Sequence, residues 1–157
     1  DTGGWRATVL AGSALGRTAP ARVYTPLVGL DMASTGPAHT QLALQPGFEH
    51  AAMVLRGAAT VAGEALAPGE WLYFAPGRTA LDVRCDGATQ WLLLGGEPFT
   101  EDILIWWNLV ARNQDELQIA LDDWNAGRFA PVRAGSPADP LAAPSLSGAR
   151  VRVSGPG

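Results

Sequence analysis

The chain offers few side chains that could do catalytic chemistry, and they are widely spaced. His39 and His50 are its two histidines, and Cys85 is its single cysteine, with no neighbouring base to activate the thiol. A stable metal site usually needs three protein ligands, so two histidines are thin support for one. All eleven positive residues are arginine, which excludes chemistry that requires a lysine amine, such as Schiff-base formation.

Two candidate sites can nevertheless be drawn around His50. A pocket inside a barrel is expected to contain His50, Val54, Tyr73 and Asp82. A weaker alternative is a metal site made by His50, His39 and Glu49. Glu49 precedes His50 directly, and neighbouring residues of a strand point to opposite faces, so both cannot face one pocket. Catalytic residues stay unassigned, and the question of enzyme activity stays open.

The elements that must position these residues read as short strands between turns. Pro-Gly and Asp-Gly pairs recur about every ten residues in the first part of the chain, as in all-β barrels and sandwiches. Pro26 interrupts one expected strand, which implies an edge or a bulge there. Strands are expected at 6–11, 21–32, 40–45, 50–56, 59–66 (a hairpin), 70–74, 79–85 and 88–95. In the segment 79–85, alternation favours Leu81 and Val83 as core-facing.

One helix is predicted at 114–126. Asn113 can accept a hydrogen bond as its N-cap, and Glu116 three residues later completes a capping-box-like pair. Gly127 suits the position just past the last turn. The segment 134–157 is rich in proline, glycine, serine and alanine, which predicts a surface-hugging or disordered tail.

Composition bounds the remaining function classes. Hydrophobic residues make up 47% of the chain and charged residues 17%, which is compatible with a globular protein. The net charge is −4, and the sequence has no cluster of basic residues that could neutralise nucleic-acid phosphates. Direct nucleic-acid binding is therefore not expected. No apolar run is long enough to span a membrane. A reducing, cytoplasmic location is expected.

The segment from Trp91 to Phe129 carries a specific resemblance. It reads WLLLGGEPFTEDILIWWNLVARNQDELQIALDDWNAGRF, and this order of strand, GGEP turn, aromatic segment and acidic helix resembles the C-terminal cupin domain of the pirin family. The segment 48–57, FEHAAMVLRG, is also similar. The resemblance implies a cupin fold, a double-stranded β-helix or jelly-roll barrel. Pirins carry two such barrels with the metal in the first, and this chain is expected to hold the second.

The resemblance also implies where cupin metal ligands would stand. With Gly57 as the anchor of the first cupin motif, His50 falls at the glutamate position, and the histidine positions fall within 43–46, which contains no histidine. In the second motif Ala75 replaces the proline and Ala80 replaces the histidine. No cofactor is therefore expected in this chain. The alternative is iron or another divalent metal held in a non-standard site around His50.

The expected organisation is a cupin barrel at 1–112, a helix and extension packed on it at 113–133, and the tail at 134–157. The expected role is that of a structural, ligand-binding or partner-binding half of a pirin-type protein. Iron-dependent quercetinase-type dioxygenase or transcriptional co-regulator activity, which the resemblance implies, would then reside in the other barrel. The alternative is a single-barrel cupin dioxygenase or isomerase. Expected partners are a second copy, a separate pirin N-terminal-type barrel, or a small apolar or aromatic ligand.

Overall fold

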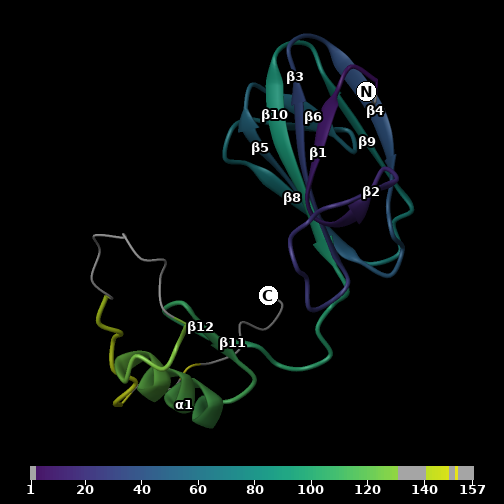
Figure 1. Ribbon diagram of the computed structural model, residues 1–157. Helices are drawn as coiled ribbons and strands as arrows, with labels where there is room; N and C mark the ends of the chain where they lie inside the picture. The colour runs from purple at the N-terminus through teal and green to yellow at the C-terminus, as the bar shows by residue number, and fades with distance from the viewer. Residues whose placement is uncertain (1–2, 131–140, 149–150, 152–157) are drawn as a thin grey trace. The chain divides into compact units, whose positions relative to one another are not determined.

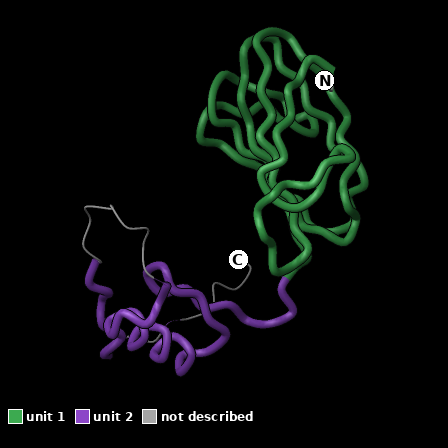
Figure 2. Tube along the Cα trace, in the orientation of Figure 1, with its two compact units in different colours: residues 1–98 green, residues 99–157 purple. Residues whose placement is uncertain are grey.

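The chain divides into two units that fold on either side of Pro98. The computed structural model describes residues 3–130, 141–148 and 151. Unit 1 is Asp1–Pro98 and unit 2 is Phe99–Gly157 (Figure 2). The boundary lies at Pro98 and not at residue 112, where the sequence predicts the end of the barrel. The reason is local, because the two strands that follow Pro98 pair with each other.

Unit 1 contains two sheets that face each other (Figure 1). The larger sheet has six strands in the order β2-β1-β3-β10-β5-β8, and the smaller has four in the order β4-β9-β6-β7. Neighbouring strands within both sheets are antiparallel. The all-β, jelly-roll type of barrel predicted from the sequence is therefore confirmed. The larger sheet comprises β1 (Arg6–Ala14), β2 (Arg17–Thr18), β3 (Leu27–Ser34), β5 (Glu49–Arg56), β8 (Trp71–Phe74) and β10 (Thr89–Gly96). The smaller comprises β4 (Ala38–Ala43), β6 (Ala59–Val61), β7 (Glu64–Leu66) and β9 (Ala80–Cys85).

Alternation of apolar and polar residues decides which side chains face the core. Along β9, Leu81 and Val83 are fully buried and Asp82 between them is exposed, because successive side chains of a strand point to opposite faces. The prediction that Leu81 and Val83 face the core is confirmed. Ala80 lies opposite Ala43 of β4, which fixes the register at the start of β9.

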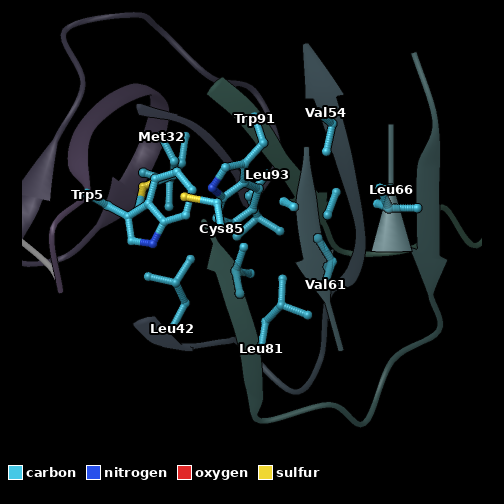
Figure 3. Close-up of a cluster of buried hydrophobic side chains, with 14 of the residues drawn as sticks. Trp5, Met32, Leu42, Val54, Val61, Leu66, Leu81, Cys85, Trp91 and Leu93 are labelled. Atoms are coloured by element: carbon cyan, nitrogen blue, oxygen red, sulfur yellow. The ribbon is translucent and has the colours of Figure 1, made fainter. Parts of the chain in front are cut away.

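Inward side chains from both sheets form one apolar core (Figure 3). Trp5 and Trp91 are fully buried and meet edge to face, with ring centroids 6.0 Å apart and planes at 81°. Such a pair contributes about 0.5–1.5 kcal/mol beyond its burial. Each large apolar side chain that becomes fully buried contributes about 1.5–3 kcal/mol. The core therefore stabilises the barrel with no need for a disulfide, and Cys85 is a buried free thiol.

Two differences from the sequence prediction have a clear physical reason. The strand expected at 21–32 begins at Leu27, directly after Pro26. β3 is flanked by β1 and β10, and a proline cannot donate the ladder hydrogen bond that a central strand needs. The short strand β2, Arg17–Thr18, pairs with the end of β1. Two residues are too few to leave an alternating pattern in the sequence.

Unit 2 begins with a short hairpin. Strands β11 (Leu104–Trp106) and β12 (Leu109–Ala111) are antiparallel. Trp107, in the turn between them, has a φ of 56°, so it leaves the extended conformation of its neighbour Trp106. No helix in the described part of the chain is long and apolar enough to cross a membrane.

Helix α1 (Gln114–Asn125) starts where the sequence predicts and ends one residue earlier. The side chain of Asn113 accepts a hydrogen bond from the backbone N–H of Glu116 at 2.9 Å, so the predicted N-cap is confirmed. Glu116 accepts a return bond from the backbone N–H of Arg112 at 3.0 Å, one residue earlier than in a capping box. Gly127 has a φ of 66°, the left-handed conformation that often follows a helix.

The helix packs within its own unit. Leu117 and Leu121 are its buried residues, and they join a cluster with Leu104, Leu109 and Leu146. Part of the predicted tail belongs to this cluster, since Leu146 is buried and the indole N–H of Trp124 donates to the carbonyl of Leu141 at 2.8 Å. The remaining tail residues, 134–140, 149–150 and 152–157, lie outside the described part of the chain.

Candidate functional site

A cavity of about 250 Å³ lies at the end of the barrel where β4 finishes and β5 begins. Both sheets contribute to its wall. None of its lining residues is an aspartate, glutamate, lysine or arginine, and His50 is the ionisable side chain among them. The aliphatic part of the wall includes Val28, Leu30, Leu42, Leu44 and Leu93. The cavity can therefore hold an apolar group next to a single imidazole.

His50 reaches this cavity because β10 carries a glycine opposite it. His50 is paired with Gly95 across β5 and β10, and its side chain is 2% exposed. A Cβ added to Gly95 would lie 2.5 Å from Cδ2 of the imidazole and 2.9 Å from the carbonyl oxygen of Glu49. The ring therefore fills the space that any larger residue at position 95 would need.

The surroundings of His50 favour its neutral form. Burial lowers the pKa of the imidazole below its ordinary value of 6.5, because the charged form loses solvation. A hydrogen bond with the Phe48 backbone partly opposes this lowering of the pKa. Nδ1 is nonetheless buried with no hydrogen bond of normal geometry to any described residue. The imidazole thus places a polar group at the cavity that favours its neutral form and whose hydrogen-bonding capacity is not fully used.

Tyr73 lies on the outer side of the larger sheet, and its placement in the barrel interior was wrong. Its partner across the strands is Ala51, which alternates with the inward residues His50 and Ala52. The Tyr73 hydroxyl donates a 2.9 Å hydrogen bond to the Glu49 carboxylate, which raises the pKa of Tyr73. Tyr73, Glu49 and His50 all border an open hollow of about 270 Å³, separate from the inner cavity.

Asp82 lies outside the barrel as well. It is on the exposed face of β9 and its carboxylate is 2.6 Å from Nε2 of His39 on β4. Val54 is fully buried on the inward face of β5, but it does not line the cavity. The four residues expected in one pocket are therefore not assembled: the interior receives His50 and Val54, and the outer faces receive Tyr73 and Asp82.

The alternative metal set is not assembled either. His50 and Glu49 border the outer hollow, whereas His39 lies on the smaller sheet beside Asp82. Among the described residues, no group of three or more histidine, cysteine, aspartate or glutamate side chains is placed to hold a metal ion. At the cupin motif positions, Ala80 faces Ala43. The donors present do not fit the metal that the cupin fold implies.

Sequence reasoning missed Gly95 and the aliphatic wall of the cavity. The signal for Gly95 was the pair of glycines that ends an apolar strand, since glycine inside a strand often marks a close approach by another group. The wall residues Leu30, Leu42 and Leu93 looked like ordinary core, and the folded structure alone shows that their side chains leave a space.

Comparison with known proteins identifies the family of this chain. Residues 29–130 match the pirin C-terminal cupin domain. The chain belongs to the pirin family. A pirin-like protein of Caulobacter vibrioides is 32% identical over 138 residues, which cover 82% of this pirin chain and 44% of that protein. A Pseudomonas aeruginosa protein named "putative quercetin 2,3-dioxygenase" is 41% identical over 120 residues, which cover 76% of this chain and 38% of the relative.

A solved structure agrees in fold. The crystal structure of quercetin 2,3-dioxygenase from Acinetobacter baumannii superposes with a TM-score of 0.84 at 36% identity, covering 99% of this chain and 52% of that one. The pirin chain thus spans about half the length of that enzyme and less than half of the two curated relatives. The resemblance drawn from the segment Trp91 to Phe129 is confirmed, and the fold is of the cupin type.

Proposed function

We propose that this chain serves as a pirin cupin barrel that does not bind the family metal and instead contributes a ligand-binding or partner-binding half. The observation that carries the proposal is the chemistry of the barrel interior. A catalytic metal usually takes three protein ligands and an open position. The inner cavity offers one ionisable side chain, the imidazole of His50, and its other lining residues are aliphatic except for Ser13 and Gln45.

Relatives named for quercetin 2,3-dioxygenase activity are about twice as long as this chain or longer. The iron-dependent dioxygenase chemistry that the family resemblance implies would have to take its metal ligands from another barrel. In this proposal the chain pairs with a pirin N-terminal-type barrel or with a second copy of itself. Its own residues shape and stabilise the assembly.

The metal content of the purified protein tests the proposal. The chain is expressed with iron, manganese, nickel and zinc available, and metal per chain is measured by plasma mass spectrometry. We expect each metal at well below one ion per chain, and no difference between wild type and His50→Ala.

His39→Ala is the matched control, because it removes the other imidazole from an exposed position. Near-stoichiometric metal that is lost in His50→Ala and kept in His39→Ala would contradict the proposal. It would favour the alternative, a single-barrel cupin dioxygenase or isomerase with its site around His50.

A further inference from the structure

The inner cavity has the size of a small ring-shaped ligand. Its volume is about 250 Å³, whereas an engineered apolar cavity of about 150 Å³ holds benzene. Pockets for drug-sized ligands start at about 300 Å³. The space therefore suits one six-membered ring with a small substituent and is too small for a molecule of several fused rings.

The cavity wall selects against charge. None of its lining residues can supply a carboxylate, a guanidinium or an ammonium group. A charged ligand would lose its hydration without gaining a partner, which is strongly unfavourable. The wall is mainly aliphatic, with Val28, Leu30 and Leu93 among its residues. Ser13 and Gln45 also line the cavity, and both are uncharged. An uncharged and mainly apolar molecule is the occupant that this wall stabilises.

The imidazole adds one polar requirement. His50 borders the cavity and is almost fully buried. The Phe48 backbone interacts with its imidazole, but Nδ1 makes no hydrogen bond of normal geometry with any described residue. Leaving a buried polar group unsatisfied is unfavourable, and a partner on a ligand would remove that penalty. A hydroxyl group can either donate to a neutral imidazole or accept from it.

We propose that this cavity binds an uncharged monocyclic molecule with one hydroxyl group, which hydrogen-bonds to the His50 imidazole. The inference sharpens the ligand-binding part of the proposed function and rests on it. Ligand chemistry of this class includes simple phenols and cyclic alcohols. The ring would pack against the aliphatic wall, and the hydroxyl group would lie next to the imidazole.

Two small probes of equal heavy-atom count test the proposal. 4-Methylphenol carries the hydroxyl group, and 4-fluorotoluene replaces it with fluorine, which is a very weak acceptor and no donor. Binding of each to the full chain is measured by isothermal titration calorimetry after chelator treatment. We expect 4-methylphenol to bind about fivefold more tightly, the ratio that one neutral hydrogen bond supplies.

Two variants assign the binding to this cavity. His50→Leu removes the polar partner and should bring the two probes to similar affinity. Ala14→Leu adds bulk at a partly buried position that lines the cavity, and should weaken both probes. Ala7→Leu, at a partly buried position on the same strand β1 but outside the cavity lining, is the matched control and should leave both affinities unchanged. Circular dichroism and thermal melting establish that each variant is folded.

The proposal is overturned if wild type binds neither probe, if it binds both equally, or if affinity is the same in wild type, His50→Leu and Ala14→Leu. The metal measurement is independent of these outcomes. Stoichiometric metal would contradict the proposed function even if 4-methylphenol bound, and failure to bind the phenol would leave a metal-free barrel in place.

Discussion

At the scale of single residues, His50 and Gly95 depend on each other. The imidazole occupies the space next to the Gly95 backbone, so the cavity wall at this point is made by a side chain from β5 across a glycine from β10. This explains why a strand that is otherwise apolar and bulky, from Trp91 to Leu94, ends in glycine. The absence of a side chain at Gly95 leaves the space that the His50 imidazole occupies.

Gly95→Ala is expected to destabilise unit 1 by about 1–3 kcal/mol, the usual cost of forcing extra atoms into a packed site. The new methyl group would displace the His50 ring or the backbone of Glu49. The free energy of unfolding from urea titration measures the effect. Gly87→Ala is the control, because a Cβ there meets nothing within 4 Å. Equal stability of the two variants would contradict the tight contact.

Burial of His50 also predicts a pH dependence. Its pKa is lowered from 6.5 in the folded chain. As pH falls below 6.5, the unfolded chain takes up a proton that the folded chain does not, so stability decreases until the pH reaches the folded pKa. Above this window the residue contributes no pH dependence.

Urea titrations of wild type and His50→Gln between about pH 7.5 and about pH 5.5 measure this effect. Wild type should lose more stability than the variant as the pH falls, because glutamine does not titrate. Parallel loss in the two proteins would show that groups other than His50 account for the pH dependence.

Sequence reasoning at this scale succeeded where alternation alone decides. It oriented Leu81 and Val83 toward the core. It failed for Tyr73, because the face of a residue in a four-residue strand depends on the pairing register with β5. Register is a property of two strands together, and a short strand alone does not encode it.

At the scale of elements, the first turn of helix α1 contains the interactions that fix where the helix begins. The Asn113 side chain satisfies the Glu116 backbone N–H, and the Arg112–Glu116 ion pair at 2.7 Å lies beside it. Acidic residues in this turn also interact favourably with the helix dipole. These signals are local in sequence, which is why the helix start could be predicted to the residue.

Asn113→Ala should destabilise unit 2 by about 0.5–2 kcal/mol, since it removes the N-cap acceptor. Amide hydrogen exchange of residues in α1 measures the loss directly. Ile119→Ala, at a position 61% exposed on the same helix, is the control and should have a smaller effect. Comparable acceleration of exchange in both variants would mean that the cap has no special role.

The positions of most strands are also encoded locally in the sequence, but which strands pair with each other is not. Pro-Gly and Asp-Gly turns predicted where most strands start and end. The end of the barrel was misplaced because residues 104–106 and 109–111 are as apolar as barrel strands, yet they pair with each other and pack on α1. Only the pairing distinguishes a barrel strand from a separate hairpin.

At the scale of the whole molecule, the outer face of the larger sheet is apolar near its β8 edge. Met53 pairs with Trp71 across β5 and β8. Trp71 is 61% exposed and Leu94 of β10 is 50% exposed. Exposed apolar side chains that gather on one face often mark a protein–protein interface, where tryptophan is enriched.

We expect the chain to form a homodimer in solution through this face. Light scattering coupled to size-exclusion chromatography at micromolar concentration should give twice the chain mass of 16.4 kDa. Trp71→Gln should shift the mass toward the monomer. Tyr24→Gln, which removes an aromatic residue 81% exposed in a loop, is the control. A monomer mass for wild type would contradict the expectation.

The distribution of tryptophan gives the molecule two built-in optical reporters. Trp5 and Trp91 meet edge to face in unit 1, and Trp107 and Trp124 do so in unit 2 at 5.1 Å and 82°. Two indoles at such distances and angles couple their electronic transitions and produce paired circular-dichroism bands of opposite sign. Each unit therefore carries its own pair of coupled indoles, and the tryptophan circular-dichroism signal contains a contribution from each unit without an added label.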